Sequence, residues 1–291
     1  MFNMGDKKPT IEGTQFLIVG IPGSGKSSAL ASFATEKNPM YVFDCDARLD
    51  GILASTWLKP HYKYIDADIY ETRLGFKAVR AKFLEFYNLH QAGKLKYKNI
   101  VVDSVSSLSQ MFLQDAQFQK ANKPTPQSAQ SAAKQLGFEE AKFETIDEYK
   151  YVLKCFHILF YDFFKSFPGV NLFLSCWTAD QWGKSPKDPY GPDIKLPGRK
   201  LFAQGNVVNE LPGYFSEVWE FHKEDPIGMG GKTRYNVTFD SALAKTSIPQ
   251  LRACRKLDTY ELNFKAELDK LMSKSEEQIL EEKKKTSAQS K

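Results

Sequence analysis

Gly20-Ile21-Pro22-Gly23-Ser24-Gly25-Lys26-Ser27-Ser28 is the most informative stretch of this sequence. It fits the pattern G-x-x-x-x-G-K-[ST] at every fixed position. Glycines let backbone N–H groups approach a polyphosphate and permit positive φ, so the stretch predicts a phosphate-binding loop. In such a loop Lys26 reaches the β- and γ-phosphates, and Ser27 offers its hydroxyl to Mg²⁺. All nine residues are therefore predicted to contact a nucleotide.

The residues on either side of the loop predict a strand and a helix. The run Phe16-Leu17-Ile18-Val19 is continuously apolar, as expected of a buried parallel strand. Residues 27–34 are predicted to form a helix whose positive dipole end points at the same anion. An ordinary glycine-rich turn is the alternative interpretation, and both flanks argue against it.

Composition sets the broad class of the protein. The 291 residues are enough for one large domain, or for one domain and a tail, and 42% of them are hydrophobic. The net charge of +5 is mild, so a basic patch has to be found locally. No apolar leader and no run of membrane-spanning length is visible, which predicts a soluble cytoplasmic protein without a membrane partner. The scattered Cys45, Cys155 and Cys176 are most simply buried free thiols.

Two acidic motifs follow apolar strands. Residues 40–43 predict a strand that ends in Asp44-Cys45-Asp46-Ala47-Arg48-Leu49-Asp50. The run Ile100-Val101-Val102 predicts another strand, and Asp103 at its end would hold Mg²⁺ directly or through water. The alternative is that Asp103 caps the next helix, since aspartate is a good N-cap.

The remaining segments predict an alternation of helices and strands around a sheet. The tail carries balanced charges, and a solvated helical face and a partner-binding or nucleic-acid-binding helix both stay open for it. The predicted elements are an amphipathic helix at 72–92, a polar functional or disordered segment at 114–146, a helix at 146–167, a strand at 170–176, a hairpin from 218–222 and 234–239 that extends the sheet, and a helix from about 257.

The acidic motifs at 44–50 and 100–105 resemble those of the RecA/RadA recombinase ATPase core. This resemblance covers about residues 14–256. It implies an α/β, RecA-like P-loop fold with a mostly parallel central sheet flanked by helices, a C-terminal β-hairpin extension and a helical tail. The domains implied are an ATPase core at 1–256 and the tail at 257–291. In this family a glutamate at the position of Asp46 activates the attacking water, which makes Asp46 and Lys26 the implied catalytic residues, and Asp50 matches a residue that contacts adenine.

The chain also resembles a narrower group of proteins in two stretches, Leu196-Pro197-Gly198-Arg199-Lys200-Leu201 and residues 211–219. These are RecA-like nucleotide-binding proteins of bacteriophages, including the Sak-type single-strand annealing ATPases. The resemblance implies Mg²⁺-dependent ATP hydrolysis coupled to single-stranded DNA in recombination or annealing. It also implies a homo-oligomer or filament, an annealing or single-strand-binding protein as a partner, and the cytoplasm of a host cell if a phage encodes the chain.

The resemblance also assigns candidate DNA contacts and a cation supplied across a subunit interface. The two DNA-facing loops of the family fall at 114–146 and 180–200, and a long surface loop with ordinary lysines is the alternative for the second. Lys245 and Arg252 are candidates for the cation that a neighbouring subunit supplies, and ordinary surface charge is the alternative. Cations neutralise phosphates and flat rings stack on bases, and the second loop contains Trp182, Lys184, Lys187, Tyr190, Lys195, Arg199 and Lys200.

Two functions of other classes also fit a phosphate loop. One is a P-loop small-molecule kinase, and the other is an ATP-sensing regulatory or interaction protein. A kinase lid usually clusters arginines, and residues 114–146 contain none, which disfavours the kinase. DNA-stimulated hydrolysis, compared with transfer of phosphate to a metabolite, separates these functions.

Overall fold

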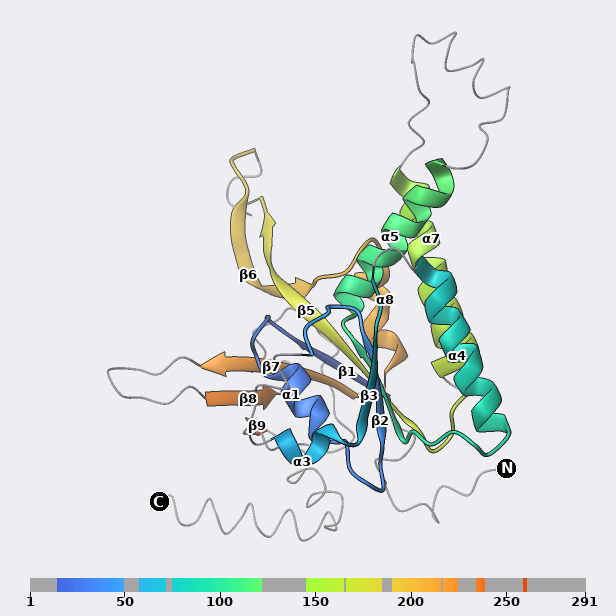
Figure 1. Ribbon diagram of the computed structural model, residues 1–291. Coiled ribbons are helices and arrows are strands. Elements are labelled where there is room, and N and C mark those ends of the chain that lie inside the picture. Colours follow the sequence, from blue (N-terminus) through green and yellow to red (C-terminus); the bar gives the residue numbers. More distant parts are fainter. Residues whose placement is uncertain are drawn as a thin grey trace, which may run out of the picture.

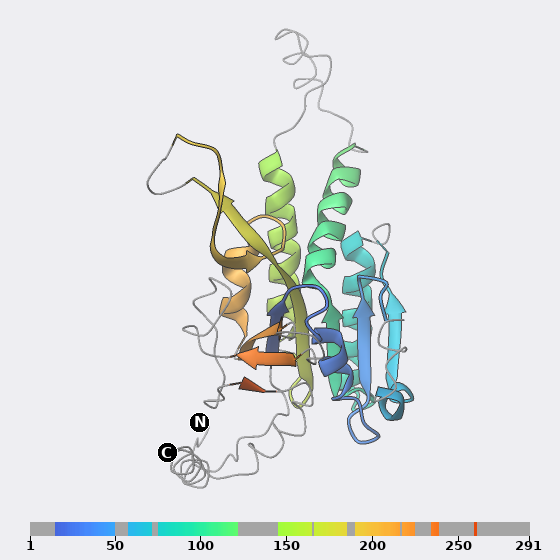
Figure 2. The ribbon, with the colours of Figure 1, turned by 90° about the vertical axis from the view of Figure 1, so that its left-hand side faces the viewer.

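A central β-sheet with helices on both faces forms the body of the protein (Figures 1 and 2). The computed structural model describes residues 15–49, 58–71, 75–121, 145–164, 166–184, 190–215, 217–224, 234–238 and 259–260. Its strands are β1 (Gln15–Gly20), β2 (Met40–Asp44), β3 (Ile65–Ile69), β4 (Asn99–Asp103), β5 (Asn171–Gly183), β6 (Ile194–Leu201), β7 (Glu217–Glu224), β8 (Arg234–Thr238) and β9 (Thr259–Tyr260).

The sheet is mostly parallel. In the part of the chain that is described, the strand order is β3-β2-β4-β5-β1-β7-β8-β9, and β6 pairs with β5 off this path. The pairs β2–β3, β2–β4, β4–β5, β1–β5 and β1–β7 are parallel. The pairs β7–β8, β8–β9 and β5–β6 are antiparallel. The predicted α/β class, with a mostly parallel sheet flanked by helices, is therefore confirmed.

The helices cover the two faces of the sheet unequally. Helices α4, α5 and α7 lie together on one face, and α1 and α3 lie on the other (Figures 1 and 2). The described helices are α1 (Lys26–Ala31), α3 (Lys59–Tyr62), α4 (Gly75–Gln91), α5 (Val105–Ala121), α7 (Thr145–Ile158), the π-helix η3 (Leu159–Phe164), α8 (Val207–Glu210) and the 3-10 helix η4 (Leu211–Tyr214).

Burial of both faces of strand β1 explains why its sequence is continuously apolar. Leu17 and Val19 pack into the core under α4, α5 and α7, whereas Phe16 and Ile18 pack into the core under α1. Successive side chains of a strand point to opposite faces, and both faces of this strand are covered. Because both sides are buried, the strand is apolar at successive positions. A half-exposed strand would instead alternate apolar and polar residues.

Most predicted elements are present. The strands predicted at 16–19, 40–43, 100–102 and 170–176 are β1, β2, β4 and the first half of β5, and the helices predicted at 72–92 and 146–167 are α4 and α7 with η3. The predicted C-terminal hairpin is β7 and β8. Strand β3 was missed, because Asp66 and Asp68 interrupt its apolar pattern. It can carry these acids because it is the edge strand next to β2, where most of its side chains are exposed.

Two of the predicted loops need correction. The segment 180–200 is largely a β-hairpin, because β5 continues to Gly183 and pairs with β6. The segment 114–146 begins as helix, since α5 runs to Ala121, and residues 122–144 lie outside the described residues. Of the predicted helical tail, only the two residues of strand β9 are described. The division of the chain at residue 256 therefore stays a prediction.

Two further observations concern membrane-spanning helices and the cysteines. No helix among the described residues is both long and apolar enough to cross a membrane. Cys155 and Cys176 are buried free thiols as predicted, whereas Cys45 is free but only half-buried.

Candidate active site

The phosphate loop joins β1 to α1, and its shape depends on glycine at two places. A Cβ atom at Gly20 would collide with the carbonyl oxygen of Phe221 on β7. Gly25, just before α1, has a φ of 88°, in the left-handed region that other residues avoid. The loop closes on a turn in which the Ser24 N–H donates to the Ile21 carbonyl over 3.2 Å. The glycines of the sequence pattern are thus required by neighbouring backbone and by the turn itself.

Lys26 lies inside this loop. Its Nζ donates to the carbonyl oxygens of Gly20 and Ile21, each over 2.9 Å, and the side chain is buried. Burial lowers the pKa of Lys26 to about 8, and the negative charge of Asp103 acts in the opposite sense. The ammonium is therefore held where a polyphosphate would lie, bonded to carbonyl oxygens that phosphate oxygens can replace.

Ser27 and Asp103 meet at the carboxyl end of the sheet. The Ser27 hydroxyl donates to Asp103 Oδ2 over 2.6 Å, and the Ser175 hydroxyl donates to Oδ1. Asp103 is buried, and this burial raises the pKa of its carboxyl. The alternative role of Asp103 as a helix cap is not observed, because Ser104 Oγ accepts the Ser107 N–H in the first turn of α5 over 3.3 Å.

These oxygen atoms fit Mg²⁺. A hydroxyl and a carboxylate are hard donors, and Mg²⁺ usually takes one or two protein oxygens and completes its shell with phosphates and water. Among the described residues, no group of three or more His, Cys, Asp and Glu side chains could enclose a metal ion. Ser27 and Asp103 would therefore hold the cation at the phosphates rather than in a site made of protein alone.

Asp46 is held beside this pair by the loop that follows β2. The carboxylate of buried Asp44 accepts the backbone N–H groups of Asp46, Arg48 and Leu49 over 3.2, 3.1 and 3.3 Å. Ser104 Oγ then donates to Asp46 Oδ1 over 2.8 Å. Asp44 lies opposite Asp103 in the β2–β4 register, so three acids gather at one edge of the sheet.

Asp44 provides a test of this loop. Replacing Asp44 with Ala removes a buried acceptor shared by three N–H groups, and should lower the free energy of unfolding by about 2–4 kcal/mol. It should also lower ATP turnover, because Asp46 loses its position. Asp44→Asn keeps one acceptor oxygen and should fall between Asp44→Ala and the native chain. Urea unfolding and steady-state turnover check this, and an Asp44→Ala protein that matches the native chain in both would contradict it.

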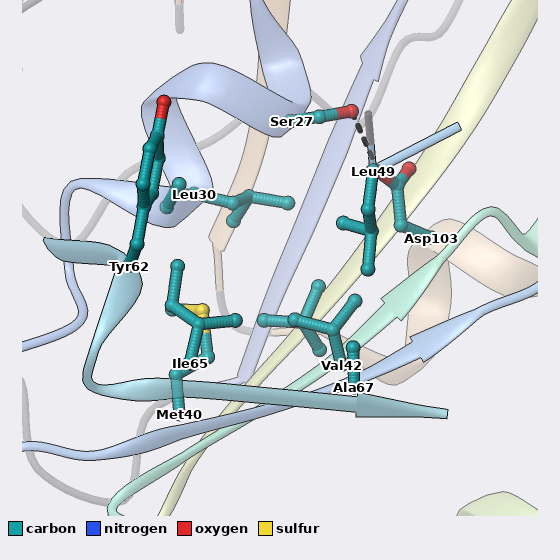
Figure 3. Close-up of a pocket in the computed structure, with 11 residues that line it drawn as sticks. Ser27, Leu30, Met40, Val42, Leu49, Tyr62, Ile65, Ala67 and Asp103 are labelled. Atoms are coloured by element: carbon teal, nitrogen blue, oxygen red, sulfur yellow. Dashed lines mark hydrogen bonds between the residues drawn. The ribbon is translucent and has the colours of Figure 1, made fainter. Parts of the chain in front are cut away.

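An apolar cavity of about 210 Å³ lies behind the Ser27–Asp103 hydrogen bond (Figure 3). Leu30 enters it from α1 and Val42 from β2, while Ser27 and Asp103 close one end. Such a lining does not suit a polyphosphate, which needs backbone N–H groups and cations. The phosphate loop therefore stays the predicted nucleotide site, and this cavity is not one.

The residues predicted for DNA contact lie on the β5–β6 hairpin, which extends away from the sheet (Figures 1 and 2). Trp182 is 64% exposed and Tyr190 is 98% exposed. Part of the positive charge is paired within the hairpin. Asp180 pairs with Lys195 over 2.7 Å and with Arg199 over 3.2 Å, Lys184 pairs with Asp193 over 3.0 Å, and Lys200 is exposed.

The structure brings some predicted residues together and does not describe others. The phosphate loop, Asp46 and Asp103 lie at one edge of the sheet. Sequence reasoning assigned no role to Ser104 and Ser175, and the only signal for Ser175 is a hydroxyl within an otherwise apolar strand. The predicted residues Asp50, Lys187, Lys245 and Arg252 lie outside the described residues.

Comparisons with known proteins give one matching family model and three solved structures with limited similarity. A family model described as "AAA domain" (AAA_24) matches residues 12–160. A KaiC-like protein from the hyperthermophilic archaeon Pyrococcus horikoshii is 15% identical, with 87% of this chain and 88% of that chain covered and a TM-score of 0.42. An ATPase from the type III secretion system of pathogenic bacteria is 9% identical, with 72% and 52% covered and a TM-score of 0.40. The RadB recombinase is 9% identical, with 86% of each chain covered and a TM-score of 0.37. No curated protein matches the chain.

Proposed function

Because this chain belongs to the AAA_24 family and is a P-loop ATPase, we propose that it couples Mg²⁺-dependent ATP hydrolysis to the binding of single-stranded DNA. The proposed DNA contact is the β5–β6 hairpin. The proposed setting is recombination or strand annealing of the kind carried out by the phage ATPases that the sequence resembles.

One observation carries this proposal: strand β5 is part of both the nucleotide site and the β5–β6 hairpin. Its residue Ser175 donates to Asp103 in the nucleotide site, and Trp182, seven positions along the same strand, is an exposed ring on the hairpin. A displacement of β5 at the nucleotide would therefore reach the hairpin through continuous backbone. This supports coupling between hydrolysis and whatever the hairpin holds.

The chemistry of the hairpin suits a single strand better than a duplex. Exposed aromatic rings such as Trp182 and Tyr190 can stack on unpaired bases without sequence preference. Lysines and arginines on the same arm can neutralise phosphates, and such binding weakens as salt rises. Asp180 and Asp193 hold several of these cations in the free protein, and phosphates would compete for them.

In the nucleotide site the residues have separate roles. Lys26 would bind the β- and γ-phosphates, and the loop N–H groups would orient them for in-line attack. Asp46, oriented by Ser104, would position the attacking water and accept its proton. Bound Mg²⁺ would neutralise phosphate charge, and Ser27 and Asp103 would hold it there.

We extend the proposal to assembly. Lys245 and Arg252 are proposed as cations that a neighbouring copy supplies to the γ-phosphate, and a homo-oligomer or filament would bring them there. An annealing or single-strand-binding protein is the proposed partner. Measuring turnover over a range of protein concentrations tests the assembly, because a site completed by a neighbour loses specific activity on dilution.

The central experiment measures ATP turnover with and without single-stranded DNA. We expect stimulation by DNA in the native chain and its loss in Trp182→Ala, whose DNA binding should weaken by about 1–3 kcal/mol. Tyr161→Ala is the control, because Tyr161 is an exposed ring (56%) outside the hairpin. Equal turnover with and without DNA would reject the coupling, and transfer of phosphate to a metabolite would favour a kinase.

Replacement of Asp180 is expected to strengthen DNA binding. Replacing it with Asn removes the carboxylate that pairs with Lys195 and Arg199, so DNA affinity should rise and the dependence of log K on log salt should steepen by up to about two phosphate contacts. Asp66→Asn removes an acid that pairs with Lys96 over 2.6 Å outside the hairpin, and it should change neither quantity. Fluorescence anisotropy with a labelled single strand measures both variants. An unchanged salt slope in Asp180→Asn would exclude the hairpin as the DNA contact.

A further inference from the structure

We propose that Arg48 is a catalytic residue of this ATPase, a cation supplied by the same subunit to the γ-phosphate and positioned by Trp177. The inference rests on ATP hydrolysis at the phosphate loop and does not depend on DNA binding. It would give the chain a charge at the reacting phosphate without a neighbouring copy.

The guanidinium of Arg48 lies against a ring of another strand. Its guanidinium carbon lies 5.3 Å from the centre of the Trp177 ring. Arg48 follows β2, whereas Trp177 is on β5, and β4 lies between these two strands. The contact between Arg48 and Trp177 therefore joins the loop after β2 to β5 across the carboxyl end of β4, where Asp103 and Ser104 lie.

Trp177 lies next to the start of the phosphate loop. In the β1–β5 register it lies opposite Gly20, the first residue of the phosphate loop. Arg48 thus reaches the strand that lies between the metal-binding acid and the loop. The next residue, Leu49, lies beside the Ser27–Asp103 hydrogen bond (Figure 3).

Among the described residues, no carboxylate pairs with the charge of Arg48. Its side chain is exposed, and within the described part of the chain it makes no ion pair, although Asp44 and Asp46 are close in sequence. Its backbone N–H is instead fixed by the Asp44 carboxylate. A fixed backbone and an unneutralised guanidinium at this edge favour an anionic ligand, and a transferring phosphoryl group is the anion expected there.

Trp177 holds the guanidinium in place. Arginine stacks well on indole, and the ring is itself supported by Phe202, with ring centres 6.4 Å apart. The backbone N–H of Trp177 donates to Ser106 Oγ over 2.9 Å, which fixes the backbone at Trp177. Trp177 is thus a positioning residue, and the charge that touches the nucleotide belongs to Arg48.

The reaction assigns a specific role to this charge. As the bond between the γ-phosphorus and its bridging oxygen breaks and water adds, the proton of the water passes to Asp46, and ADP leaves with the bonding electrons. Negative charge on the γ-phosphoryl oxygens and on the departing oxygen would be stabilised by Arg48, as arginines do in other phosphoryl transfers.

The test measures Arg48→Ala without DNA. We expect kcat to fall about 100-fold or more, binding of a non-hydrolysable ATP analogue to weaken about tenfold, and ADP binding to stay unchanged because ADP lacks the γ-phosphate. Arg48→Lys should recover part of the rate. Arg80→Ala removes an exposed arginine of α4 and should match the native chain. Equal losses of ADP and analogue binding, or a native rate in Arg48→Ala, would overturn the proposal.

Two further variants separate positioning from general stability. Trp177→Phe should keep most of the rate, because a ring remains under the guanidinium, whereas Trp177→Ala should approach Arg48→Ala. Addition of Trp177→Ala to Arg48→Ala should then lower the rate little further, and independent losses that multiply would contradict the pairing.

A mixing experiment tests whether Arg48 acts within its own subunit. Lys26→Ala and Arg48→Ala proteins are combined and assayed for turnover. A cation that acts within the subunit predicts no recovery, because neither chain has a complete site. Recovery of activity would show that Arg48 acts across an interface and would overturn the assignment. The DNA proposal is untouched by either result, because no DNA is present.

Discussion

ATP turnover should fall about 1000-fold when Lys26 is replaced by Ala. The ammonium lies within the loop and is its only side-chain cation. Without it, the loop has backbone N–H groups but no full positive charge for the β- and γ-phosphates. Binding of both ATP and ADP should weaken, and calorimetry with each nucleotide measures this.

Folding should survive this substitution. The native side chain donates to the carbonyls of Gly20 and Ile21, but burial of its charge is costly, as the lowered pKa of Lys26 indicates. The two effects oppose each other, so the free energy of unfolding should change little. Lys77→Ala, at an exposed lysine of α4, is the matched control and should retain full turnover. A Lys26→Ala protein with native turnover would refute the nucleotide site itself.

Replacing Asp46 with Ala should lower kcat about 100- to 10000-fold while leaving nucleotide affinity nearly unchanged. The carboxylate accepts a hydrogen bond from Ser104, and no hydrogen bond joins it to the loop among the described residues. Its removal therefore affects the attacking water rather than the binding of ATP. Rapid-quench turnover and analogue binding, measured on the same preparation, separate the two quantities.

Two substitutions refine the role of Asp46. Asp46→Asn keeps the size and the bond from Ser104 but loses the basic oxygen, so it should be nearly as slow as Asp46→Ala. Asp46→Glu lengthens the side chain by one methylene to the residue found in the recombinases that the sequence resembles, and should retain measurable turnover. Tight ATP binding in a native chain with no turnover, and no effect of Asp46→Ala, would instead indicate that ATP is only a conformational ligand.

Prediction from sequence succeeded where the determining interactions are local. The phosphate loop is a run of nine residues whose glycines, lysine and serine act on one another over a few positions. The strands β1, β2 and β4 were visible because both faces of each are buried, which makes their sequences continuously apolar. Burial on one side only made helix α4 visible through its repeating apolar face.

The β5–β6 hairpin was missed because its strands are only partly buried. Beyond the edge of the sheet, β5 and β6 have partly exposed faces, so their sequence lacks the apolar run that marked the other strands. Cross-strand pairing contributes instead, with Asp180 opposite Arg199 and Trp182 opposite Lys195. Glycines, prolines and lysines in such an arm resemble a loop when only their order is known.

The sequence by itself determined that a phosphate loop, a strand before it and acid-ended strands after it belong to an α/β ATPase, because each of these patterns is a short run of neighbouring residues. Only the tertiary structure decided which side chains meet. Ser27 and Asp103 are 76 positions apart and Ser104 and Asp46 are 58 apart, and they touch because β4 lies next to β2 and only β5 separates it from β1. Arg48 reaches Trp177 for the same reason, since strand order, which no local pattern encodes, brings the ends of distant strands to one edge.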